Sequence, residues 1–218
     1  MLEGAIIGAI VGLVMAFMAM QQRRGLLTKV LAALARGGQT AARAQLDTSA
    51  RPTQELKLRD IDKQRQRMAC LALIGDVEAL AREIESHRGP LTAVAQVNRV
   101  GHLGLALRSQ GEQRARTIAA LDELAARMER EGGALMGIVK KQTHAIASVG
   151  RGLLGQPIPT ELWVTANTLS KEKSVVGLVI SQALGEAFAA INRLDRAEPY
   201  FVRVRAATQA FERRADAA

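Results

Sequence analysis

Aromatic residues and cysteine are scarce in this chain of 218 residues. Phe, Trp and Tyr together make up 3% of it. Because strands are enriched in aromatic and β-branched side chains, this composition favours packed helices over sheets. The single cysteine, Cys70, excludes an internal disulfide and a cysteine-rich zinc or iron–sulfur site. The histidines, His87, His102 and His144, show no i, i+4 pairing of the kind that metal ligands use on a helix. We therefore expect an all-α protein without a metal or another cofactor.

Motifs of common enzyme classes are also missing. The chain has no Gly-rich phosphate loop ending in Lys and Ser or Thr, no Gly-x-Ser-x-Gly turn and no His-Glu-x-x-His pair. Gly101 and Gly104 lie within a helical pattern, where close packing of helices explains them better than phosphate binding. Cys70 has apolar neighbours, which is typical of a buried and unreactive thiol. The sequence therefore predicts a protein that is not an enzyme; a hydrolase or transferase on an unfamiliar helical fold is the alternative.

Other side chains that could take part in catalysis have simple structural interpretations. His102 follows Gly101 and is expected to be packed in the interior or at an interface. His144 follows two lysines and is expected at the surface. Glu83 and Glu85 are expected on a polar helix face with no chemical role.

A long apolar run covers Gly4–Met20 and contains no charged or hydrogen-bonding side chain. In a helix its 17 residues would extend about 25 Å, near the lower limit for crossing a bilayer core. We therefore expect a transmembrane anchor over residues 1–22, with a buried core helix as the alternative. Small residues recur at every fourth position and share one helix face, where a second helix can approach closely, so self-association is expected. These residues are Gly4, Gly8, Gly12 and Ala16.

Charge next to this run predicts its orientation. Glu3 is the only charged side chain before the run, whereas Arg23, Arg24 and Lys29 follow it. By the positive-inside rule, we expect an uncleaved anchor in a bacterial-type inner membrane, with the C-terminal body in the cytoplasm. A body on the opposite, periplasmic side is the alternative, because a short and weakly charged terminus can override the rule.

The net charge of +9 is concentrated beside the predicted anchor, since residues 21–60 hold eight basic side chains and three acidic ones. Juxtamembrane Lys and Arg are attracted to anionic lipid headgroups. No aromatic residues are interleaved with these charges, so nucleic acid is not an expected partner. Apolar residues of this segment share one helix face, so it is expected to lie along the membrane or to continue the anchor inward: Leu26, Leu27, Val30, Leu31 and Leu34. Residues 23–54 are thus interpreted as a basic juxtamembrane helix followed by residues 38–54, which are the weakest of the expected helices or a linker.

The remainder, residues 55–218, is expected to be a series of helical hairpins. Helix-breaking residues recur at intervals of roughly forty residues, which is typical of stacked helix–turn–helix repeats. The breakers are Gly37–Gly38, Gly75–Asp76, Gly111–Glu112, Gly150–Gly152 and Asn192–Arg193. Between breakers the periodicity is helical: in Glu112–Arg130 one face is apolar and the other is charged. The apolar face comprises Ile118, Leu121, Leu124, Ala125 and Met128.

The last hairpin resembles a tetratricopeptide repeat. Leu184-Gly185 with Phe188 one turn later, the turn at Asn192, then Ala197 and Phe201 follow that pattern. Gly185 and Ala197 would let two helices meet closely while Phe188 and Phe201 fill the space beside them. Leu103–Leu107 followed by Gly111 matches the first half of the pattern.

The resemblance implies a tetratricopeptide-like α-solenoid whose concave surface holds a peptide or a helix of a partner. Polar residues of the first helices would line that groove: Asn98, Arg108, Gln182 and Asn192, with Arg99 and Lys173 nearby. Amides and cations suit a peptide backbone and carboxylates, so a protein partner with an acidic or a C-terminal carboxylate motif is expected.

The layout of one anchor and a cytoplasmic repeat body also resembles membrane-anchored tetratricopeptide adaptors of bacterial envelope biogenesis. Some of those end in a four-cysteine metal module, which a chain with one cysteine cannot form. The expected function is a membrane-anchored scaffold that recruits a protein partner. The alternative is an oligomerising, membrane-active protein in which the small residues of the anchor carry the function.

Overall fold

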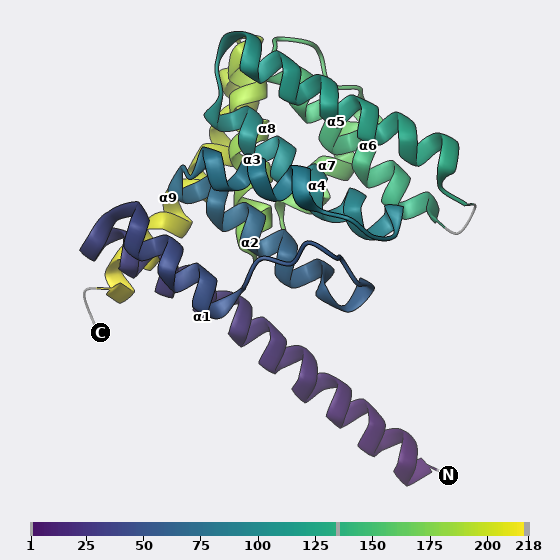
Figure 1. Cartoon of the computed structure of the whole chain (residues 1–218), viewed down its shortest axis with the longest axis vertical. Helices are drawn as coiled ribbons and strands as arrows, with labels where there is room; N and C mark the ends of the chain where they lie inside the picture. The colour runs from purple at the N-terminus through teal and green to yellow at the C-terminus, as the bar shows by residue number, and fades with distance from the viewer. Residues whose placement is uncertain (1, 134–135, 216–218) are drawn as a thin grey trace.

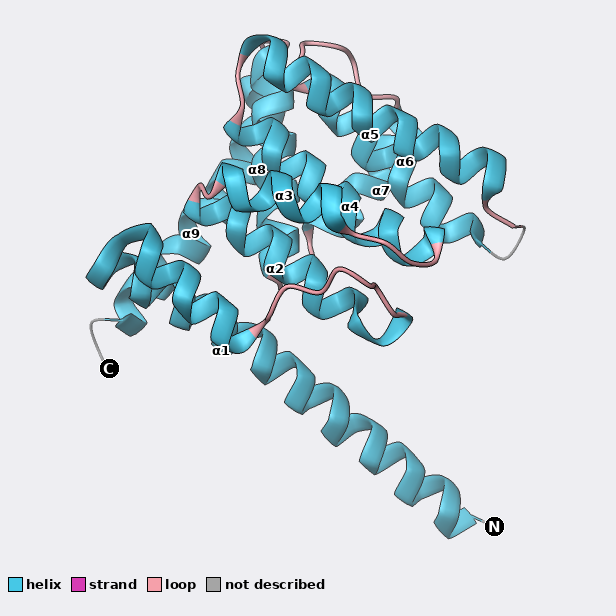
Figure 2. Ribbon diagram, in the orientation of Figure 1, coloured by secondary structure: helices cyan, strands magenta, loops and turns pink. Residues whose placement is uncertain are grey.

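Helices make up the regular structure of the described chain, as the scarcity of aromatic residues predicts (Figure 2). The structure is a computed structural model that describes the backbone of residues 2–133 and 136–215, and the side chains of residues 25–133, 136–207 and 209. The helices are α1 (Leu2–Ser49), η1 (Leu58–Asp60), α2 (Ile61–Ile74), α3 (Val77–Ser86), α4 (Leu91–Arg108), α5 (Gly111–Glu131), α6 (Gly137–Gly152), α7 (Thr160–Ser170), α8 (Val175–Ala190) and α9 (Leu194–Ala215). Extended pairing in the described residues is limited to one parallel bridge between Glu55 and Arg88. The all-α expectation is confirmed.

Three of the predicted turns are present, and each uses a residue with a left-handed backbone. Gly75 ends α2 with a φ of 75°, Gly111 begins α5 with a φ of 54°, and Asn192 separates α8 from α9 with a φ of 58°. Glycine and asparagine adopt this conformation more readily than other residues, which is why they mark turns in the sequence. The other breakers also fall at the end of a helix or at a kink.

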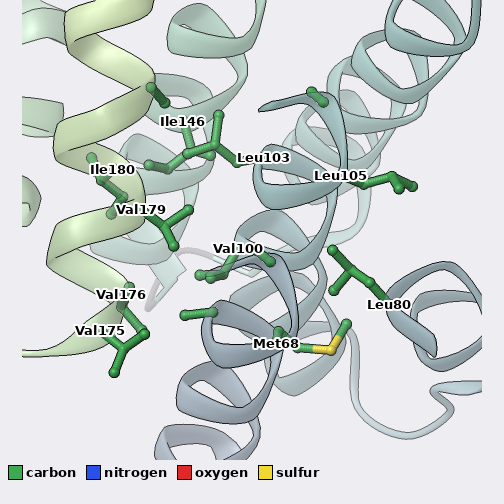
Figure 3. Packing of buried hydrophobic residues seen from close by; sticks show 14 of the residues in the cluster. Met68, Leu80, Val100, Leu103, Leu105, Ile146, Val175, Val176, Val179 and Ile180 are labelled. Carbon is green, nitrogen blue, oxygen red and sulfur yellow. The ribbon is translucent and has the colours of Figure 1, made fainter. Parts of the chain in front are cut away.

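Helix α8 lies at the centre of the body and packs against α2, α4, α6, α7 and α9. Its sequence carries one charged residue, Glu186, so it is apolar on nearly every side, as a buried helix must be. Val175, Val176, Val179 and Ile180 point from α8 towards α4 and its neighbours (Figure 3). Because α8 contacts α2 and α4, the last hairpin and the first helices share one hydrophobic core. A hairpin in this body therefore packs against hairpins that are distant in the sequence as well as against its neighbours.

Two glycines in α4 allow α2 and α3 to approach closely, as expected for Gly101 and Gly104. A Cβ atom at residue 104 would lie 2.5 Å from the Cβ of Ala72 on α2. One at residue 101 would lie 2.6 Å from Cε of Met68 and 2.8 Å from Cγ1 of Ile84. Any larger side chain would separate these helices. The predicted apolar face of α5 is confirmed too, since Ile118, Leu121, Ala125 and Met128 are buried and Leu124 packs against the core.

Helix α1 is one continuous helix up to a sharp bend at Gly37 and Gly38, whose backbone angles are non-helical. Its first part runs away from the other helices (purple in Figure 1), and its bend lies beside α9. Leu27 and Val30 are buried in the common core. The segment with Leu27 and Val30 therefore continues the first helix into the body, which was one of the two arrangements expected of it.

The linker predicted over residues 38–54 is wrong, because helix continues to Ser49. Ala42, Leu46 and Ala50 are fully buried, one turn apart. A neighbouring row of polar side chains holds the same segment: Gln39 Nε2 donates to the carbonyl of Ile74 at 3.0 Å, and Arg43 pairs with Asp76. Small residues weaken the helical pattern of this segment in the sequence. The same small residues allow the helix to lie close to α2.

Within the part of the chain that the structure describes, no helix is both long enough and apolar enough to cross a membrane. The side chains of the predicted span Gly4–Met20, including the small residues Gly4, Gly8, Gly12 and Ala16, lie outside the described residues. The backbone of this segment is part of α1.

A buried ion-pair network joins α1, α2 and α3. The guanidinium of Arg67, 2% exposed, donates to both carboxylate oxygens of Glu83 at 2.6 to 3.0 Å and to the carbonyl of Ala50 at 2.7 Å. Asp47 Oδ1 lies 2.8 Å from Nη1 of the same arginine. The expectation that Glu83 occupies a solvated face is wrong, since it is the buried partner of Arg67; Glu85 is exposed as expected.

Candidate partner-binding site

Asn98, the first of the predicted partner-binding residues, is buried and serves the fold. Its Nδ2 donates to the carbonyl of Ile84 at 3.0 Å, near the end of α3, and its Oδ1 lies 2.7 Å from Nδ1 of His87. Only 6% of the residue is exposed. Its amide therefore closes the α3–α4 connection and does not face a groove.

Arg108 is exposed but already bonded to the end of another helix. Its Nε donates to the carbonyl of Ala72 at 2.8 Å, and its Nη2 donates to that of Leu73 at 3.1 Å. Carbonyl groups in the last turn of a helix lack intrahelical partners, so Arg108 caps α2. Its guanidinium thus has a structural role at the α2–α3 turn.

Gln182 and Asn192 have local roles in α8 and in the turn that follows it. Gln182 Nε2 donates to Oε1 of Glu186, one turn along α8, at 3.1 Å. Asn192 is exposed and supplies the left-handed turn before α9. Of the four predicted residues, Asn98 and Arg108 therefore bond to carbonyl groups at helix ends. Gln182 pairs within α8, and Asn192 forms a turn.

A different group of charged residues gathers where α2, α4, α6 and the turn before α8 meet. We call Arg65, Arg99 and Glu172 the arginine cluster. Arg65 comes from α2, Arg99 from α4, and Glu172 from the turn that joins α7 to α8. Lys171 and Lys173, both exposed, flank Glu172 in the sequence. Arg99 and Lys173, which the sequence suggested as neighbours of the site, are therefore in or beside this cluster.

The turn that carries Glu172 is held by specific local contacts. Ser174 caps the N-terminus of α8, since its Oγ accepts from the backbone N–H of Gly177 at 3.3 Å. A Cβ atom on residue 177 would lie 2.2 Å from the carbonyl oxygen of Glu172, so only glycine lets this turn fold against α8. Ser181 Oγ donates to the carbonyl of Ser170 at 3.2 Å and ties the end of α7 to α8. Glu172 is thus presented at a defined place beside the N-terminus of α8.

Arg99 is the most deeply buried cation of the cluster and bonds only to neutral groups among the described residues. It is 1% exposed, and its Nη2 donates to Oε1 of Gln142 at 2.7 Å. Weaker contacts of Nη1, at 3.4 Å, reach Oγ1 of Thr143 and the carbonyl of Val139. Burial lowers the pKa of Arg99, the nearby Arg65 lowers it further, and Glu172 raises it. Its positive charge is therefore incompletely balanced.

Arg65 stands between this buried charge and solvent, with its side chain 14% exposed. Its Nη2 lies 3.4 Å from Oε2 of Glu172, a long contact for an arginine–carboxylate pair, which prefers 2.7 to 2.9 Å. Its Nε is buried and makes no hydrogen bond to the described residues. A guanidinium normally binds a carboxylate through two parallel N–H groups, so the Arg65 fork is only partly used.

The arginine cluster is suited to binding an oxyanion. The guanidinium of Arg65 contacts the carboxylate of Glu172, the Arg99 cation lies close enough for both to affect its pKa, and the N-terminus of α8 adds positive potential. The only group of the cluster able to act as a base or nucleophile is the carboxylate of Glu172, which pairs with Arg65. Among the described residues no three His, Cys, Asp or Glu side chains gather as metal ligands.

The remaining reactive side chains are buried in packing positions. Cys70 is fully buried, and burial raises the pKa of its thiol to about 12, so the interpretation of an inert thiol agrees with its surroundings. Burial lowers the pKa of His102 to about 4, which keeps the ring neutral, as expected for a packed histidine. His144 lies nearer the surface, with Nε2 3.4 Å from Oε2 of Glu129.

Sequence reasoning missed Arg65 and Glu172, because 107 residues separate them. The available signal was Ser174, a residue type preferred at helix N-caps, which follows a charged turn and precedes an apolar run. Neither residue stands out by itself in a chain with 30 basic and 21 acidic side chains.

No family model, no curated protein and no solved structure matches this chain.

Proposed function

We propose that this protein is a membrane-anchored helical adaptor that recruits a protein partner at the cytoplasmic face of a bacterial-type inner membrane. In this proposal residues 1–22 form the anchor, and the body of tetratricopeptide-like hairpins forms the recruiting part. The continuity of α1 is the observation that carries it: one helix begins in the apolar run, passes Arg23 and Arg24, and enters the core at Leu27 and Val30. A helix that continues into a packed core would couple an anchor to the body without a hinge before Gly37.

The hairpin assignment is supported by the turns at Gly75, Gly111 and Asn192 and by close α8–α9 packing at Gly185. Contacts of α8 with α2 and α4 favour a compact body over a long concave groove. For this reason we propose the arginine cluster, rather than the inner face of a superhelix, as the place where an acidic partner binds.

Membrane fractionation of the full chain tests the anchor. In a bacterial host, the wild-type protein is expected to stay in the membrane pellet after an alkaline carbonate wash. Replacing Val11 and Met15 by Arg adds about 3 kcal/mol per residue to insertion and should release the protein. Arg at Leu58 and Ile138, which are 67% and 75% exposed in the body, is the matched control and should leave it in the pellet.

Fusions after Ala218 test the orientation. A fluorescent protein should be fluorescent there, and alkaline phosphatase should be inactive, since that enzyme needs an oxidising compartment to form its disulfides. Carbonate extraction of the wild-type chain would refute the anchor, and active phosphatase would refute the cytoplasmic body.

The alternative is a membrane-active protein that oligomerises through its first helix. The period of four in Gly4, Gly8, Gly12 and Ala16 favours it, because residues four apart on a helix share one face and small residues there allow a second helix to approach closely.

A further inference from the structure

Arg65 binds the carboxylate of Glu172 through a weak contact. Glu172 reaches it through a single oxygen at 3.4 Å, and Nε of Arg65 makes no hydrogen bond to the described residues. The carboxylate comes from a turn, is 37% exposed, and its Oε2 also receives a long contact of 3.5 Å from Oγ of Ser174. Arg65 itself is 14% exposed, so loss of the carboxylate without a replacement would leave a largely buried cation unpaired. Glu172 is therefore expected to leave only when another carboxylate takes its place.

The surroundings of Arg65 favour exchange for a better acceptor. Arg99 lies near enough for the two cations to repel, and its own hydrogen bonds go to Gln142, Thr143 and the carbonyl of Val139. A carboxylate bonded to both Nε and Nη2 of Arg65 would balance this charge better than Glu172 does. Lys171 and Lys173, exposed on the same turn, would attract further acidic residues of an incoming segment.

We propose that Arg65 receives an acidic side chain from the protein partner, and that Glu172 is an internal competitor which the partner displaces. This inference rests on the proposed adaptor function, because it names the chemistry of the recruited segment. Glu172 itself indicates the chemistry of the ligand: the group already at Arg65 is a carboxylate on a short tether. Displacement makes recruitment selective, since weakly acidic sequences do not outcompete a tethered glutamate.

Peptide binding to the full chain in nonionic detergent tests the proposal. The probe is fluorescently labelled hexaglutamate, measured by fluorescence polarisation. Glu172→Gln removes the competitor and should tighten binding about tenfold, a difference of about 1.4 kcal/mol. Arg65→Gln should abolish binding, and Arg65→Lys should weaken it strongly, because lysine keeps the charge but lacks the guanidinium fork.

The control is an ion pair of the same type on α5. Arg127 and Glu131 pair at 3.0 Å with both side chains about half exposed. Glu131→Gln changes the net charge by the same amount as Glu172→Gln but should leave the affinity for the probe within about twofold, since exposed charges are screened. Arg127→Gln serves the same purpose for Arg65→Gln. Equal tightening by Glu131→Gln and Glu172→Gln would refute the displacement model.

Three further measurements distinguish a misfolded variant, a wrong ligand assignment and a failed anchor. Thermal unfolding of each variant identifies loss of binding by misfolding, and probe-induced stabilisation should be larger for Glu172→Gln than for wild type. Displacement of the probe by millimolar phosphate but not by acetate would overturn the carboxylate assignment. Membrane fractionation of Arg65→Gln should match wild type, so a failed anchor and a failed binding site give different results.

Discussion

Gly185 on α8 lies directly beneath the ring of Phe201 on α9. A Cβ atom at residue 185 would lie 2.6 Å from Cε1 and 2.9 Å from Cδ1 of that ring. Ala197, 1% exposed, completes the close approach of the two helices, and Phe188 stacks on Tyr200 with centroids 6.0 Å apart. The expectation that Gly185 and Ala197 let these helices meet is confirmed.

Gly185→Ala should therefore destabilise the protein although alanine favours helix. Added volume in a tight contact costs about 1–3 kcal/mol, which exceeds the gain of up to about 1 kcal/mol from replacing glycine within a helix. Urea unfolding followed by circular dichroism measures the change. Gly137→Ala is the control: a Cβ there meets nothing within 4 Å, so its stability should be unchanged or higher. Equal behaviour of the two variants would contradict the packing argument.

Asn98→Ala should reduce stability rather than partner binding. It removes two buried hydrogen bonds and leaves the carbonyl of Ile84 and the His87 ring without their partner, at a cost of about 1–3 kcal/mol. The measurement is the unfolding free energy, with Gln182→Ala, at a half-buried position, as the control of small effect. Normal stability together with lost partner capture would restore Asn98 as a binding residue.

Acid should destabilise the protein through its buried histidines. Burial lowers the pKa of His102 to about 4 and also lowers that of His87, which is bonded to Asn98 and faces Glu83 and Arg67. An unfolded histidine titrates near 6.5, so below that pH the unfolded state binds more protons and stability falls. At pH 5 the loss from His102 is about 2 kcal/mol relative to neutral pH.

Melting temperatures between pH 7.5 and pH 5 measure this loss. His102→Gln should flatten the profile, whereas His144→Gln, at a more exposed position, should leave it as in wild type. A wild-type profile that rises towards pH 5 would show that the histidines are charged in the folded state.

Gly8→Leu tests self-association through the anchor. If Gly4, Gly8 and Gly12 form a contact face, leucine separates the two helices and should weaken association in a bacterial membrane two-hybrid assay by about tenfold, the range of a contact of 1–2 kcal/mol. Leu13→Ile lies on another face and should have no effect. Identical signals from both variants would leave the glycines without a role in association.

The sequence alone determined the properties that depend on local backbone and on periodicity. Gly75, Gly111 and Asn192 mark turns because their backbones tolerate a positive φ that other residues resist. The apolar face of α5 and the burial of Cys70 follow from apolar neighbours at helical spacing. The close packing at Gly185 and Phe201 could be predicted because the two residues belong to helices that are adjacent in the sequence.

Tertiary structure decided which polar residues meet and which are buried. The other acidic residues of α3, Glu78 and Glu85, are exposed, yet Arg67 from α2 makes the burial of Glu83 favourable; no local pattern contains that partner. Asn98 and Arg108 look like free binding groups until the ends of α3 and α2 lie beside them and supply carbonyl groups that accept from them. Arg65 and Glu172 meet across 107 residues because α8 inserts at the centre of the bundle. Charge attraction depends on distance in space and not on separation in the sequence. Such pairs are therefore determined only when the packing of the apolar helix faces has brought the helices together.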